Sequence, residues 1–307
     1  MSMFLKGIIY TSFASVFWGL PQVLFFNNIK NIPPIEIISH RALWSFVLLF
    51  LLVFFTKKLI ELKKIFLNKK IIFFLSVTAL LVSFNWFLFI LSISISRVQD
   101  ASMGYFISPI ISVGLGYIFF KEKLSILQII SLILIVFSII LILFKLKIFP
   151  FLAVGIALSW AFYGLIRKKI NINPEIGLTF ESGFLSILAL SYLFFLYQTN
   201  QNVFINSETN IKFLLMCTGI VTVIPLFFFN LGVKVLPLGV TGIIFFLNPT
   251  FQFLTSVFIL KETIIQIKVI SFIIIWIAII IFLLDKFKTE YKLNKKNTNE
   301  SSIQLPN

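Results

Sequence analysis

The chain alternates long apolar runs with short polar segments, and the apolar runs recur from its first residues to about residue 285. Each run is close to the roughly 20 residues that a helix needs to cross the hydrocarbon core of a bilayer. The pattern predicts an all-α integral membrane protein with about ten transmembrane helices. We place these helices at residues 7–27, 35–55, 71–93, 98–120, 124–144, 149–166, 175–197, 211–232, 237–260 and 264–285.

The composition also points to lipid as the solvent. Of the 307 residues, 59% are hydrophobic and only 12% are charged, which is more apolar surface than one soluble core can bury. The single cysteine, Cys217, and the single histidine, His40, argue against a disulfide framework and against a multi-ligand zinc or haem site. We therefore expect no metal and no cofactor.

Charge falls unevenly on the two ends of the predicted helices. With the N-terminus in the cytoplasm, 18 Lys and Arg residues lie on the cytoplasmic side and seven on the opposite side. The positive-inside rule then places both termini in the cytoplasm. This topology explains the formal net charge of +15 without nucleic acid, because the lysines lie between apolar runs. Abundant Phe, Ile, Lys and Asn, whose codons are AT-rich, favour the inner membrane of a bacterium.

An internal repeat emerges when the sequence is compared with itself at an offset of 140 residues. Residues 1–145 and 146–285 form two repeats of five helices, followed by a basic polar tail, 286–307, that we expect to be disordered in the cytoplasm. Because five is odd, the second repeat enters the membrane in the opposite orientation, which gives a 5+5 inverted repeat suited to transport. The offset aligns Pro34 with Pro174, Pro109 with Pro249, Lys121 with Lys261, Glu122 with Glu262 and Ser131 with Ser271.

Two prolines mark a candidate substrate cavity. Pro109 and Pro249 lie near the middle of the fourth and ninth predicted helices, where each removes a backbone donor and frees the carbonyl one turn earlier. Such interruptions occur at the midplane binding sites of secondary transporters. Ordinary kinks in packed helices are the alternative. The neighbouring residues that would line the cavity are Tyr105, Ser108, Phe245 and Asn248.

Further candidates for the cavity are an amide and several aromatic side chains inside the helices. Asn85, next to Trp86, must either line a wet cavity or form an interhelical hydrogen bond. Trp18 and Trp160 occupy comparable positions in the first helix of each repeat, and with Tyr163 they could form walls for a flat or cationic solute. Ordinary tryptophan packing is an equally good interpretation.

Three ionisable residues inside the predicted helices are candidates for gating or coupling. His40 and Arg41 lie about two turns into the second helix, and an unpaired arginine at the bilayer centre costs about 2.5–3.5 kcal/mol. Glu181 occupies the position that matches Arg41 in the other repeat. The two could act as a pair, a proton site or a gate, or each could extend separately to the membrane surface.

The sequence lacks the motifs of several other function classes. No P-loop is present, so the chain would need a gradient or a partner subunit to drive transport, and protons are one candidate coupling ion. Polar residues are scattered rather than gathered at one membrane face, which makes a membrane-embedded enzyme a weaker alternative. A scaffold is also weaker, because the sequence predicts neither a large soluble domain nor a long structured loop. The expected partners are a small-molecule substrate and the lipid bilayer. Glycines in the fourth and ninth helices leave monomer and dimer both open.

Several stretches resemble a known transporter family. They are HRALWS (40–45), ASMGYFISPIISVGLG (101–116), SWAFYGLIRKK (159–169) and the long block from 221 to 262. Together they resemble the RarD group of the EamA-type drug/metabolite transporters, over about residues 3–285. The resemblance implies a ten-helix carrier with both termini in the cytoplasm and a poorly defined substrate. Val233 and Lys234 stand where many relatives have a basic pair, so no substrate is carried over.

Overall fold

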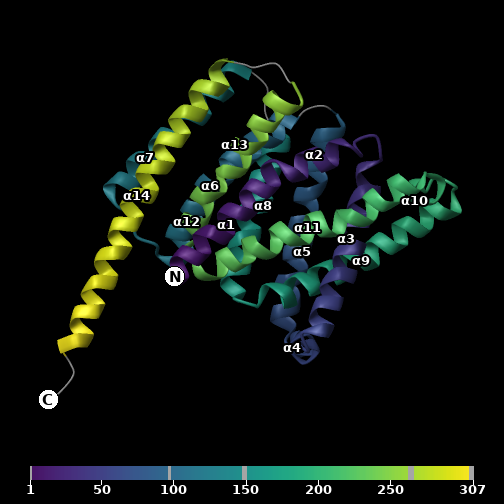
Figure 1. Cartoon of the computed structure of the whole chain (residues 1–307), viewed down its shortest axis with the longest axis horizontal. Helices are drawn as coiled ribbons and strands as arrows, with labels where there is room; N and C mark the ends of the chain where they lie inside the picture. Colours follow the sequence, from purple (N-terminus) through teal and green to yellow (C-terminus); the bar gives the residue numbers. More distant parts are fainter. Residues whose placement is uncertain (1, 96–97, 147–150, 262–265, 304–307) are drawn as a thin grey trace. The chain divides into compact units, whose positions relative to one another are not determined.

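The computed structural model describes residues 2–95, 98–146, 151–261 and 266–303, and all regular secondary structure in these ranges is helical. Figure 1 shows the helices in chain order. They are α1 Met3–Gly19, α2 Pro21–Asn27, α3 Pro34–Phe55, α4 Leu59–Ile65, α5 Lys69–Ser94, α6 Val98–Phe120, α7 Ile126–Leu146, α8 Phe151–Ile170, α9 Pro174–Gln198, α10 Val203–Asn206, α11 Thr209–Val235, α12 Leu238–Phe245, α13 Leu247–Leu254, the π-helix η1 Thr255–Ile259 and α14 Gln266–Ile303.

The predicted all-α membrane architecture is confirmed. Among the described residues, nine helical segments are long and apolar enough to cross a membrane, and α7 contributes a shorter apolar stretch, Ile126–Leu141. These ten segments correspond to the ten predicted runs, with boundaries that move by a few residues. The predicted starts at residues 149 and 264 lie outside the described residues.

Two of the predicted helices are broken rather than continuous. The first breaks at Leu20, whose backbone angles of φ −123° and ψ −73° are not helical, because Pro21 begins a new helix. The ninth breaks at Phe246, whose N–H bonds to the carbonyl only three residues back, at 3.2 Å. Pro249 has no N–H to offer the carbonyl of Phe245, so the regular ladder cannot pass this point. The same span ends in the π-helix η1.

Contacts divide the chain into two compact units, one made of residues 1–116 with 149–262 and the other of residues 117–148 with 263–307. In the first unit, α1 packs against α11, and their counterparts in the repeat, α8 and α5, pack against each other. α3 packs against its own counterpart, α9. This pairing is what a two-fold relation between five-helix repeats produces. In the second unit, α7 packs along α14, joined by hydrogen bonds of 2.8 Å and 3.3 Å between Ser138 and Ser271.

The repeat is also visible in the backbone where helices end. Lys121 and Lys261, which the 140-residue offset aligns, both have positive φ, at 53° and 58°. Lys57 after α3 and Asn200 after α9 form a second pair, at 57° and 56°. Non-glycine residues adopt this left-handed conformation infrequently, so its recurrence at matching helix ends reflects a shared local structure.

The last helix extends beyond the last apolar run. α14 continues as a helix through Ile303, past the polar residues that follow Asp285. Lys and Glu are good helix formers, and extending an existing helix avoids the cost of nucleation. Near the start of this extension, the Asp285 carboxylate accepts hydrogen bonds from Ser125 and Gln128, at 2.5 Å and 2.9 Å.

Candidate functional site

Aromatic rings from both repeats gather at one place in the first unit. Trp18 of α1 meets Trp160 of α8 edge to face, with ring centroids 5.0 Å apart. Phe245 of α12 stacks on Trp160 at 5.2 Å and contacts Tyr105 of α6 at 5.8 Å. Tyr105 and Phe245 are 140 residues apart and are therefore repeat counterparts, while Trp18 and Trp160 hold comparable positions in the first helix of each repeat. The rings therefore mark the line along which the two repeats meet.

These rings surround a small closed cavity. It has room for about one water molecule, so no metabolite fits in this state of the protein. Aromatic rings form most of its wall, and four amide side chains supply the polar part. The lining residues are Trp18, Gln22, Asn85, Trp86, Phe89, Tyr105, Trp160, Phe245, Asn248 and Gln252.

The two broken helices meet at this cavity. A Cβ atom on Gly19, at the end of α1, would lie only 2.6 Å from the backbone oxygen of Asn248 in α13. The carbonyl of Gly19 accepts a hydrogen bond of 3.0 Å from the hydroxyl of Thr255, the first residue of the π-helix. Gln22 on α2 and Asn248 on α13 both line the cavity. Interrupted helices with this placement are the elements from which secondary transporters build substrate sites.

The polar groups of the cavity are only partly satisfied. Asn85 donates to the Ile156 carbonyl at 3.0 Å and accepts from the Tyr105 hydroxyl at 3.0 Å, so it both forms an interhelical bond and lines the cavity. The side-chain oxygens of Gln22 and Asn248 are buried and have no hydrogen-bond partner among the residues that the structure describes. Buried amides without partners are costly, so these two are available to a ligand.

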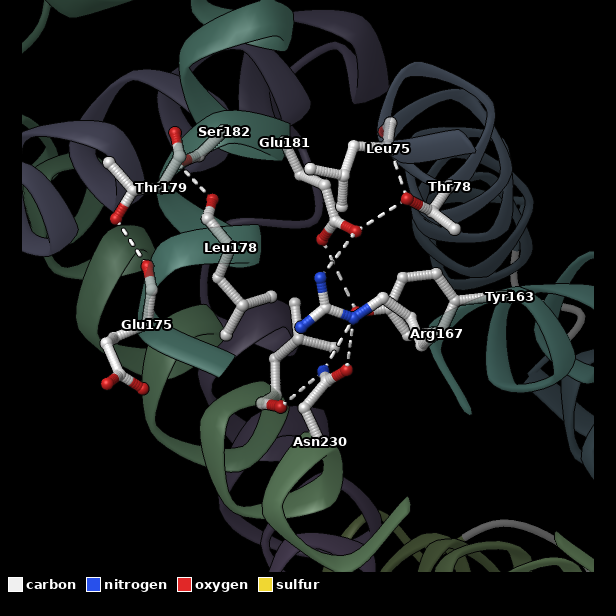
Figure 2. A network of polar contacts seen from close by, with 11 residues as sticks. Leu75, Thr78, Tyr163, Arg167, Glu175, Leu178, Thr179, Glu181, Ser182 and Asn230 are labelled. Atoms are coloured by element: carbon white, nitrogen blue, oxygen red, sulfur yellow. Dashed lines mark hydrogen bonds and ion pairs between the residues drawn. The ribbon is translucent and has the colours of Figure 1, made fainter. Parts of the chain in front are cut away.

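Beside the aromatic cluster lies a buried ionic network, drawn in Figure 2. Glu181 of α9 accepts hydrogen bonds from Thr78 at 2.6 Å and from Arg167 Nη1 at 3.3 Å. Arg167 Nε also donates to Asn230 at 2.7 Å, and Asn230 donates to the Tyr163 hydroxyl at 2.8 Å. The Arg167 and Glu181 side chains are 2% and 3% exposed, so this ion pair is shielded from solvent.

Arg41 has its own partners and does not share those of Glu181. Its guanidinium carbon lies 4.4 Å from the centre of the Trp86 ring and 4.8 Å from that of Phe26. Nε donates to the Thr222 hydroxyl at 3.0 Å, while Nη1 and Nη2 have no hydrogen-bond partner. Arg41 and Glu181 are both buried within the protein.

A second small cavity also has room for about one water molecule. It shares Trp86 with the first cavity. Glu181 and Thr222 line the second cavity together with Ser45, whose buried hydroxyl has no hydrogen-bond partner.

The structure brings seven of the eleven candidate cavity residues around the first cavity, while the others lie elsewhere. Tyr163 stacks on Trp160 but belongs to the Glu181 network. Pro109 lies against Gly242 of α12, and the hydroxyl of its neighbour Ser108 is buried without a hydrogen-bond partner. The seven are Trp18, Asn85, Trp86, Tyr105, Trp160, Phe245 and Asn248; Ser108, Pro109, Tyr163 and Pro249 do not line the cavity.

His40 is separate from both cavities. Its ring lies 4.9 Å from that of Phe204, and neither ring nitrogen has a hydrogen-bond partner. Within the described part of the chain, His, Cys, Asp and Glu do not gather in groups of three that could hold a metal.

Sequence reasoning missed several residues of the site. Arg167 is one of the 18 Lys and Arg residues that the predicted topology places on the cytoplasmic side, but it is buried and pairs with Glu181. Its spacing of seven from Trp160 and four from Tyr163 puts it on their face of α8, and this signal could have identified it. Gln22, Asn230 and Gln252 are amides inside apolar runs, the same signal that singled out Asn85.

Comparisons with known proteins agree with this geometry. The sequence profile of the EamA-like transporter family matches residues 5–144 and again residues 148–284. The chain belongs to this family. It is 32% identical over 290 residues to protein RarD of Escherichia coli K12, covering 94% of this chain and 98% of that protein. It is 33% identical to the uncharacterized transporter YojE of Bacillus subtilis, covering 92% and 95% of the two chains.

A protein of known crystal structure shares the fold. Its TM-score is 0.66 at 13% sequence identity, and the match covers 91% of this chain and 97% of that one. The family, the relatives and the apolar helices together make this chain a multi-pass membrane protein with a transporter role. The predicted membership of the RarD group of EamA-type transporters is confirmed.

Proposed function

We propose that this EamA-family protein is a secondary transporter that exports or exchanges a small metabolite or drug across the bacterial inner membrane by alternating access. The observation that carries the proposal is the meeting of two interrupted helices at a closed cavity built from both repeats. The moving parts are the five-helix repeats, residues 1–145 and 146–285. Both termini lie in the cytoplasm, as the distribution of lysines predicts.

The size of the cavity assigns a state to the structure. Room for about one water molecule is too little for a solute, which fits the occluded state of a transport cycle. In an inverted repeat, the two halves can exchange conformations, and each exchange opens the site to the opposite side. The aromatic walls and the unsatisfied amides of Gln22 and Asn248 would then contact the solute.

Protons are the coupling ion that the buried network favours. Glu181 is a carboxylate held by Arg167 inside the protein. Taking up a proton would remove the negative charge that Arg167 pairs with, and releasing it would restore the pair. Such a change in a buried ion pair can bias one conformation over another. His40 and Arg41, which lie on α3 against other elements, remain candidates for gating.

The test is transport by purified protein in proteoliposomes, with a labelled metabolite and drug panel and an imposed proton gradient. We expect gradient-dependent flux of at least one compound. Asn85→Ala should abolish this flux because it removes the amide that joins α5 to α8 and Tyr105. Glu181→Gln should uncouple the flux from the gradient, because glutamine cannot exchange a proton.

Asn206→Ala is the matched control, since Asn206 is an exposed amide in the short helix α10. Flux that survives in Asn85→Ala at the wild-type rate would contradict the assigned site. Flux that ignores the gradient in the wild-type protein would contradict proton coupling and leave exchange as the mechanism. No flux of any compound would count against the transport proposal itself.

A further inference from the structure

Arg41 is a fully buried cation whose terminal nitrogens have no hydrogen-bond partner in the part of the chain that the structure describes. Its side chain is 0% exposed, and Nη1 and Nη2 make no hydrogen bond. Only Nε is used, in the bond to Thr222. The Phe26 and Trp86 rings contact the guanidinium and offset part of the cost of burying the charge. The four N–H donors of the two Nη groups remain unsatisfied.

In the described part of the chain, neither of the two buried glutamates of this region pairs with Arg41. Glu181 binds Arg167 and Thr78. Glu36, five residues before Arg41 on α3, accepts a hydrogen bond at Oε1 from the backbone N–H of Phe204 at 3.1 Å, and its Oε2 is buried with no hydrogen-bond partner. Buried cations in membrane proteins are normally paired, and an isolated one is a sign of a functional site. The Arg41 guanidinium therefore has no anionic partner among the described residues. A bound molecule could supply one.

We propose that Arg41 binds the carboxylate of the transported solute. The proposal rests on the transport function proposed above and names the class of solute: a monoanionic organic acid with a flat apolar body. The planar guanidinium offers two parallel donors, which match the two oxygens of a carboxylate. Its single charge neutralises a carboxylate, whereas a phosphate dianion would keep an unpaired negative charge in the same buried space.

The surroundings of Arg41 supply the remaining contacts. Trp86, on which the guanidinium stacks, lines both cavities. Trp18, Trp160 and Phe245 line the first cavity together with Trp86, and their rings suit a flat apolar body. In the second cavity, the buried Ser45 hydroxyl has no partner among the described residues and can donate to the carboxylate. The solute enters when the site opens, and it contacts Trp86, which lines both cavities.

The experiment compares three probes of nearly the same size and shape: benzoate, which is anionic, benzamide, which is neutral, and benzamidinium, which is cationic. Binding to the purified protein in detergent is followed by tryptophan fluorescence, because three indole rings surround the site. We expect wild-type protein to bind benzoate at least about tenfold more tightly than benzamide, which is the factor that a charged hydrogen bond supplies. Benzamidinium should bind most weakly.

Arg41→Met keeps the long apolar stem and removes the charge. In this variant the ratio of benzoate to benzamide affinity should fall to about one, since only the charged contact is lost. Benzamide is the internal control for folding, and its affinity should stay within about threefold of wild type. If Arg41→Met does not give monodisperse protein, Ser45→Ala serves instead and should lower the ratio several-fold.

Two outcomes overturn the proposal. One is wild-type protein that binds benzoate and benzamide equally well, or that binds none of the three probes measurably. The other is an unchanged preference for benzoate in Arg41→Met. Because binding is measured without flux, the result is independent of the transport assay. Transport without a preference for benzoate would support the proposed function and contradict the role of Arg41. A preference for benzoate without transport would support the role of Arg41 in binding and contradict the proposed function.

Discussion

The indole rings of Trp18 and Trp160 meet edge to face, with centroids 5.0 Å apart and ring planes at 89°. The two residues hold comparable positions in the first helix of each repeat, so their contact joins the repeats at equivalent points. Any movement of one repeat against the other must change this contact. The pair therefore ties the internal symmetry of the chain to the opening and closing of the cavity that both rings line.

Trp160 is one of the central rings of the aromatic cluster. It contacts Trp18, Tyr163, Phe229 and Phe245. Trp160→Ala should lower the free energy of unfolding by about 3–5 kcal/mol and abolish transport, because it leaves a large void. Trp160→Phe should retain measurable flux. Thermal unfolding in detergent and proteoliposome flux test both variants, and an alanine variant as stable and active as wild type would contradict the account.

The buried pair of Arg167 and Glu181 should be sensitive to removal of one partner. Arg167→Met leaves the carboxylate without its countercharge and should cost about 3–5 kcal/mol of stability. The double variant Arg167→Met with Glu181→Gln should recover most of the loss, since no charge is then left unpaired. A thermal unfolding series on the four proteins measures the coupling. Additive losses in the double variant would show that the two side chains do not interact.

Close approach of α1 to α13 should depend on Gly19. In Gly19→Ala, the new Cβ would meet the Phe251 Cβ at 2.5 Å and the Asn248 backbone oxygen at 2.6 Å. Because these groups are rigid and cannot move away, we expect the free energy of unfolding to fall by about 1–3 kcal/mol and transport to be slower. Gly114→Ala is the control, because nothing lies within 4 Å of the added atom and helix propensity favours alanine. Equal stabilities for the two variants would argue against the close contact.

The ion pair between Lys58 and Glu175 should contribute little, in contrast to the buried pair. Its atoms are 2.5 Å apart, but the Lys58 side chain is 37% exposed. The hydrogen bond to Glu175 raises the pKa of Lys58 above its ordinary value of 10.5. The contribution of this ion pair to the free energy of unfolding is thus present below pH 10.5. It disappears as the pH rises through the raised pKa of Lys58.

Lys58→Gln measures this contribution. At neutral pH it should lower the free energy of unfolding by less than about 1 kcal/mol and leave flux unchanged. The difference from wild type should shrink in strongly alkaline buffer, where the wild-type lysine is also neutral. Thermal unfolding at both pH values checks the sign. A difference that grows with pH would mean that the charge is not what stabilises the contact.

Much of the fold follows from the sequence because the membrane imposes simple rules. Run length fixes the number of spans, and rare residues such as Pro109 and Pro249 reveal the repeat. The breaks at Leu20 and Phe246 were harder to predict, since a proline in a membrane helix can be accommodated without a break. Whether the helix separates depends on what packs against it, here the contact of Gly19 with α13.

The site could be predicted only in part, for a related reason. Sequence periodicity identifies residues inside helices, but it does not say which helix faces which. Trp18, Asn85 and Trp160 were found because their types are unusual at that depth, and tertiary contacts then brought them together. Arg167 was missed because its neighbours Lys168 and Lys169 make the segment look like an ordinary basic loop. Only the pairing with Glu181 distinguishes it.

The most direct test of alternating access is labelling of a cysteine placed in the cavity. Cys217 is replaced by alanine, and Gln22→Cys introduces a single thiol at the cavity wall. A membrane-impermeant maleimide is then applied to sealed vesicles of each orientation. We predict labelling from both sides, with a transported compound or proton gradient shifting the balance between them. Labelling from one side only under every condition would contradict the account, because the cavity would then never open to the opposite face.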